Sequence, residues 1–112
     1  MVLRLLDPAR RRILFTFLAE SELVNIIDLS KADLGGTNLR GANLHGANLS
    51  EANLRNADLS GALLNFANLR GTKLGAANLD GLDLLTARVT MKQLLEAKSL
   101  KDTTIPDGSI HA

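Results

Sequence analysis

Residues 27–86 read IDLSK ADLGG TNLRG ANLHG ANLSE ANLRN ADLSG ALLNF ANLRG TKLGA ANLDG LDLLT, which is twelve quintets in a row with no insertion. The third place of every quintet is Leu. The first place is small, with Ala in eight quintets and Thr in two, and the second is Asn or Asp in all but two. Gly is common in the fifth place. A fixed period of this kind indicates a repeat architecture rather than an irregular globule.

Neither an α-helix nor a straight strand accounts for a period of five. A helix turns by about 100° per residue, so leucines five apart would not form a stripe. A strand alternates its faces with a period of two, so successive leucines would fall on opposite faces. The chain must therefore turn once in each quintet. The first and third residues then point inward, and the other three point outward, with Gly permitting the corner.

The composition supports a core made of aliphatic side chains. The chain has three Phe and no Trp, Tyr or Cys, so it has no disulfide, thiolate metal site or thiol nucleophile. The third places form the predicted structural core: Leu29, Leu34, Leu39, Leu44, Leu49, Leu54, Leu59, Leu64, Leu69, Leu74, Leu79 and Leu84.

These quintets resemble the A(D/N)LxG consensus of the pentapeptide-repeat family over about half of the chain. The resemblance implies an all-β solenoid, a right-handed quadrilateral β-helix with four quintets per coil. Twelve quintets then give about three coils, with Leu29, Leu49 and Leu69 in one column. The layout of the whole chain is similar to that of short pentapeptide-repeat proteins known mostly from cyanobacteria.

The two flanks are expected to cover the ends of this repeat within a single domain of residues 1–112. Residues 1–26 are predicted to form an N-terminal helical cap, since Asp7 and Pro8 suit a helix start that runs to about Ser21. Residues 87–112 are predicted to hold a short C-terminal helix, from a capping box at 90–93 to about residue 98, and then a tail. Within it, residues 103–107 look like one degenerate quintet, out of phase by one residue, and the tail from Gly108 is expected to be loose.

No constellation of residues predicts catalysis or a bound metal or cofactor. The chain has two His, of which His111 lies in the tail, and the column of His45 holds neither a nucleophile nor a second metal ligand. We expect no enzyme, no cofactor and no small-molecule substrate. The repeated Asn and Asp are interpreted as turn residues that bond nearby backbone. A cytoplasmic location is expected, although Arg10, Arg11 and Arg12 before an apolar run also resemble a signal peptide start.

One of the four faces of the predicted shaft differs from the others. Its outward residues are Asn43, His45, Leu63, Asn65, Phe66, Asp83, Leu85 and Thr86. Leu63, Phe66 and Leu85 replace polar residues of the repeat, and a cluster of exposed apolar groups usually marks a contact. We interpret these three, with His45 and Asn65, as a candidate interaction face. The alternative is that a terminal helix or the tail folds over them.

The favoured function is a non-catalytic protein-interaction or scaffolding module, whose partner is another protein or a second copy of the chain. The alternative, implied by the family resemblance, is a DNA mimic that inhibits or protects a type II topoisomerase. Mimicry needs carboxylates placed like phosphates on a long rod, whereas residues 27–86 carry six acidic and five basic side chains. The formal net charge of the chain is +1, which predicts no nucleic-acid partner, and no apolar run is long enough to predict a membrane span.

Overall fold

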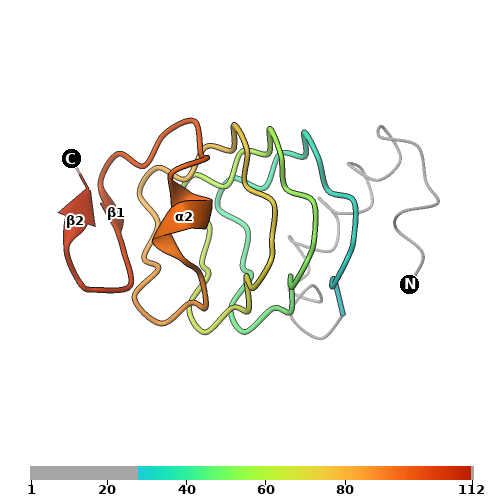
Figure 1. Cartoon of the computed structure of the whole chain (residues 1–112), viewed down its shortest axis with the longest axis horizontal. Coiled ribbons are helices and arrows are strands. Elements are labelled where there is room, and N and C mark those ends of the chain that lie inside the picture. Colours follow the sequence, from blue (N-terminus) through green and yellow to red (C-terminus); the bar gives the residue numbers. More distant parts are fainter. Residues whose placement is uncertain (1–27, 112) are drawn as a thin grey trace.

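The computed structural model describes residues 28–111, in which the quintets wind into a four-sided solenoid. Parallel bridges join residues twenty apart on each side, as in Asp28 to Asn48 and Asp33 to Asn53. One coil is therefore four quintets, as the family resemblance implies. Figure 1 shows the coils stacked along the long axis of the molecule. The predicted helix that ends near Ser21 lies outside the described residues.

Each corner of the shaft is a hydrogen-bonded turn. The first residue of a quintet donates its N–H to the carbonyl of the preceding Leu, as Ala42 does to Leu39 at 3.0 Å. The fifth residue has a positive φ in every quintet from 27–31 to 77–81, which is typical of a type II turn. The second-place side chain accepts the fourth-place N–H, as in Asn38 with Arg40 at 3.1 Å. The prediction that Asn and Asp serve the turns is thus confirmed.

The core consists of stacked aliphatic columns. All twelve third-place leucines are buried, and none is more than 2% exposed. Backbone hydrogen bonds link the coils, for example from Leu54 N–H to the Lys73 carbonyl at 2.9 Å. Thr72, which stands where Ala is usual, is buried, and its hydroxyl donates to the Leu49 carbonyl at 2.7 Å. Its polar atom is therefore satisfied inside the apolar column.

The solenoid continues beyond the expected three coils. Arg88 pairs with Asn68, twenty residues away, whereas Ser99 pairs with Asn78 and Thr104 with Asp83, each twenty-one residues away. The added residue lies near the short helix α2 (Met91–Leu94). The four Leu columns are extended by Val89, Leu94, Leu100 and Ile105, which are buried or packed against the core. The expected one-residue shift of the quintet 103–107 is confirmed.

The predicted C-terminal helix is shorter than expected. Its capping box is present, because Gln93 N–H donates to the Thr90 hydroxyl and Gln93 Oε1 accepts Thr90 N–H. The expected extension to residue 98 is wrong. The reason is that the chain rejoins the ladder, where Ala76 N–H donates to the Glu96 carbonyl at 2.9 Å and Lys98 N–H to the Ala77 carbonyl at 2.7 Å.

The tail covers part of the C-terminal end, so the expectation that it is loose from Gly108 is wrong. Strand β1 (Thr103–Thr104) belongs to the last coil, and β2 (Ile110–His111) pairs with it in the antiparallel direction. Figure 1 places this hairpin at the end of the stack. It occupies hydrogen-bonding groups that would otherwise form an open edge of the last coil.

Candidate protein-interaction surface

The surface that the sequence singled out is one side of the shaft, which we call the fourth face. It consists of the outward residues of the quintets 42–46, 62–66 and 82–86, and the quintet 103–107 extends it by one coil. Parallel bridges from Asn43 to Leu63 and from Asp83 to Thr104 place these quintets along the same side.

Three apolar side chains of this face are open to solvent. Leu63 is 52% exposed, Phe66 64% and Leu85 51%. We call these three residues the apolar patch. Within residues 28–111 these side chains are exposed, whereas the third-place leucines beside them, Leu64 and Leu84, are buried. Asn65, in the same quintet as Leu63 and Phe66, is partly buried.

Phe66 stands at a corner of the shaft and makes two contacts, one through its ring and one through its backbone N–H. Phe66 has a φ of 62°, in the left-handed region where other corners carry Gly. Its ring lies 5.6 Å from that of His45, centroid to centroid, with 70° between the planes. This edge-to-face arrangement is favourable for aromatic pairs. Its N–H donates to the Thr86 hydroxyl at 3.0 Å instead of to a carbonyl of the next coil.

The ladder between coils is interrupted at the patch. No bridge joins Leu63 to Asp83 within residues 28–111, although both pair with their other neighbours along this face. Two sequence features coincide with the gap. Leu82 is buried in a first place where the smaller Ala62 stands one coil earlier. Thr86 ends its quintet without a positive φ, as expected for a β-branched residue, so this corner differs from the others.

The described outward residues of the fourth face include carboxylates but neither Lys nor Arg. Its charged residues are Asp83 and Asp107, both exposed. The hydroxyl and the N–H of Ser109 both donate to Asp107, which holds the pKa of that carboxyl below its ordinary value. By contrast, each of the other three faces has cations: Lys31, Arg70 and Arg88 on the first, Arg55 and Lys73 on the second, and Arg40 and Lys101 on the third.

The repeats themselves decide the family. Residues 27–65 match eight copies of the unit described as pentapeptide repeats. The chain is a pentapeptide-repeat protein. The family implies a right-handed β-helix, which agrees with the parallel four-sided ladder and with the sequence-based expectation.

Comparison with solved structures gives matches to fourteen chains, one of them HetL, a pentapeptide repeat protein involved in heterocyst differentiation regulation from the cyanobacterium Nostoc sp. strain PCC 7120. The match has 34% sequence identity and a TM-score of 0.33, and it covers 75% of this chain. This pentapeptide-repeat protein spans 43% of the HetL chain. A search of curated proteins found no match to the sequence.

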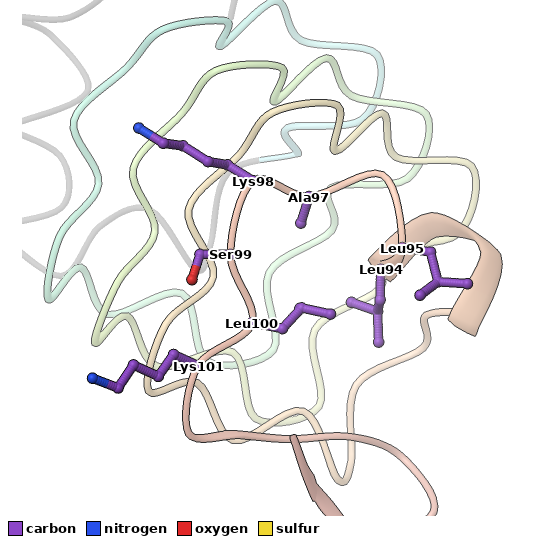
Figure 2. Close-up of a pocket in the computed structure, with 7 residues that line it drawn as sticks. All are labelled: Leu94, Leu95, Ala97, Lys98, Ser99, Leu100 and Lys101. Carbon is purple, nitrogen blue, oxygen red and sulfur yellow. The ribbon is translucent and has the colours of Figure 1, made fainter. Parts of the chain in front are cut away.

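The rest of the described chain was compared with the fourth face for metal-binding clusters, membrane-spanning helices and pockets. Across residues 28–111 no cluster of three or more His, Cys, Asp or Glu could hold a metal ion. No helix in that part of the chain is long and apolar enough to cross a membrane. A pocket of about 350 Å³ lies on the last coil. Figure 2 shows Leu94 and Leu100 pointing into the coil, and Lys98 and Lys101 pointing away from it. This pocket lies apart from the fourth face.

The sequence placed Thr86 on this face without showing its role, and it gave no role to Leu82. Thr86 accepts the N–H of Phe66, and Leu82 and Thr86 both lie in the quintet where the ladder is interrupted. The signal was present in the sequence. Leu82 is a large residue in a small place, and Thr86 is a β-branched residue in a place where Gly is common.

Proposed function

We propose that this pentapeptide-repeat protein is a non-catalytic interaction module that docks another protein on its fourth face. The observation that carries the proposal is the apolar patch, in which Leu63, Phe66 and Leu85 are each more than half exposed. The patch stands on a shaft whose other outward places are mostly polar. Exposed apolar side chains that cluster on one face usually mark a contact surface.

The patch supplies enough energy for a weak contact. Burial of apolar surface contributes about 25 cal/mol per Å², so the exposed parts of three side chains give a few kcal/mol. Association itself costs roughly 4 kcal/mol or more in lost freedom. Polar neighbours such as Asn43 and Asp83 would then form a rim that contributes hydrogen bonds and orientation. The shaft holds all of these groups on a regular backbone, so little ordering is needed on binding.

The test compares capture of proteins from a cell extract by three immobilised forms of the full chain. One is the wild type, one carries Leu63→Ser, Phe66→Ser and Leu85→Ser, and the control carries Leu95→Ser and Ile110→Ser. The control removes two apolar side chains that are each 69% exposed but lie outside the patch. We expect the patch variant to lose specific proteins that the wild type and the control both retain. If all three forms capture the same proteins, the fourth face is not the docking surface.

A further inference from the structure

We infer that the segment docked on the fourth face is a basic amphipathic helix of the partner protein. This inference rests on the proposed function and adds the chemistry of the partner. It draws on the charges of the face, on its size, and on the state of its backbone groups.

The charges of the fourth face favour a cationic partner. Among the outward described residues of its four quintets, the acidic residues are Asp83 and Asp107, and neither Lys nor Arg is present. The formal charge of these carboxylates is therefore −2. Asp83 stands two residues before Leu85 of the patch. The nearest cations in sequence order belong to neighbouring faces. Lys or Arg side chains beside an apolar stripe would thus meet opposite charge at the edge of the patch.

The size of the patch fits a short segment better than a large interface. A stable protein dimer buries about 800 Å² on each partner. An aromatic side chain buries about 150–250 Å² in full. Three side chains that are little more than half exposed offer far less than a dimer needs. Two or three apolar anchors at helical spacing, i, i+3 or i+4, and i+7, match a patch of this extent.

The backbone of the face favours a helix over an added strand. The fourth face is the side of a shaft, and apart from the step between Leu63 and Asp83 its quintets pair with neighbouring coils, as Leu63 N–H does with the Ala42 carbonyl and Leu84 N–H with the Thr104 carbonyl. The interrupted step between Leu63 and Asp83 lies between two coils and is not a free sheet edge. A docked segment must therefore satisfy its own backbone, which an α-helix does.

The same charges disfavour two other occupants. In a symmetric dimer through this face, the two Asp83 and two Asp107 carboxylates would be brought toward one another, and like charges oppose such a contact. An anionic membrane surface attracts clusters of Lys and Arg, and it would repel these carboxylates.

The experiment uses the full chain and three labelled synthetic peptides. The first is an 18-residue helix with a Leu stripe flanked by Lys, the second has Glu in place of every Lys, and the third is a scramble of the first. Fluorescence anisotropy at low salt should show the Lys peptide binding at least about fivefold more tightly than the Glu peptide. The scramble should not bind, and the preference should shrink as salt is added.

Variants of the chain separate the two parts of the account. Asp83→Asn with Asp107→Asn should abolish the preference for Lys over Glu, while Glu51→Gln with Asp102→Asn, on other faces, should leave it unchanged. Equal binding of both peptides by the wild type, or binding of neither, overturns the inference. Dimerisation of the chain through the patch, or binding of the chain to phosphatidylserine vesicles, would also overturn the inference. The proposed function survives these results if the patch variant still loses its captured proteins, and it fails separately if that loss is absent.

Discussion

From residue 31 to residue 81, the fifth residue of every quintet lies in the left-handed region whether or not it is Gly. Gly61 has a φ of 71°, and Ala76 has a φ of 58° at the equivalent place of another quintet. The left-handed region costs a residue with a Cβ roughly 1–2 kcal/mol. The repeat therefore imposes this conformation through its hydrogen bonds, and Gly reduces its cost.

Exchanging residues at two corners should change stability in opposite directions. Gly61→Ala should lower the free energy of unfolding by about 1 kcal/mol, since a Cβ there meets nothing within 4 Å and the cost is that of the backbone alone. Ala76→Gly should raise the free energy of unfolding by a few tenths to about 1 kcal/mol. The gain is limited because Gly increases the conformational entropy of the unfolded chain. Urea denaturation of both variants measures the effect. Two unchanged midpoints would show that the corners are not under this backbone constraint.

At the scale of the repeat element, the quintet 82–86 differs from the eleven before it. The amides of Leu64 and Asp83 make no hydrogen bond to another described residue, whereas the equivalent amides of Leu44 and Leu63 do. Leu82 places a larger buried side chain in this quintet than the usual Ala, and Thr86 does not adopt the positive φ of the other corners. The ladder between the second and third coils is thus weakest beneath the apolar patch.

Restoring the consensus should close this gap. In the wild type, the amides of Leu64 and Asp83 should exchange with deuterium faster than that of Leu44, because they lack a partner. Leu82→Ala with Thr86→Gly should slow both amides toward the rate of Leu44, although loss of the buried Leu82 side chain should lower global stability by about 2–5 kcal/mol. Exchange resolved by residue with NMR provides the measurement. Slow exchange of Leu64 and Asp83 in the wild type would contradict this explanation.

At the scale of the whole molecule, the period of five in the sequence predicted the features that repeat with every quintet. The leucine columns, the turns and the patch residues all follow from positions within the quintet. The fourth coil was missed because its second places, Arg88, Gln93, Ser99 and Thr104, hold neither Asn nor Asp, and because Leu100 and Ile105 are displaced by one residue from the period of five after α2. The exposure of the patch could not be derived either, since it depends on where the terminal segments pack. The gap beside Leu82 could not be derived, because a sequence pattern does not show which backbone groups of neighbouring coils meet.

Acid should destabilise the whole molecule below about pH 4. Burial raises the pKa of Asp58, but hydrogen bonds from Ser60 and the charges of Arg40 and Lys98 outweigh it and lower the pKa. The pKa of Asp28 is also lowered, chiefly by the hydroxyl and N–H of Ser30. A carboxyl with a lowered pKa in the folded state stabilises it above the unfolded pKa, and this stability is lost as pH falls through the folded pKa. The urea concentration at the denaturation midpoint should be constant from pH 7 to about pH 5 and should decrease at pH values below about 4. This decrease should be smaller in the variant Asp58→Asn.

The thermal unfolding midpoint of the variant Leu63→Ser, Phe66→Ser, Leu85→Ser tests most directly whether the patch is free to bind a partner. The account predicts a shift of only a few degrees from the wild type, because substitutions of exposed residues usually change stability by less than about 0.5 kcal/mol each. Leu54→Lys, in the buried column, serves as the comparison and should unfold the shaft. A loss of roughly 10 °C or more in the triple variant would show that the protein's own chain covers these residues, and would contradict the proposed docking face.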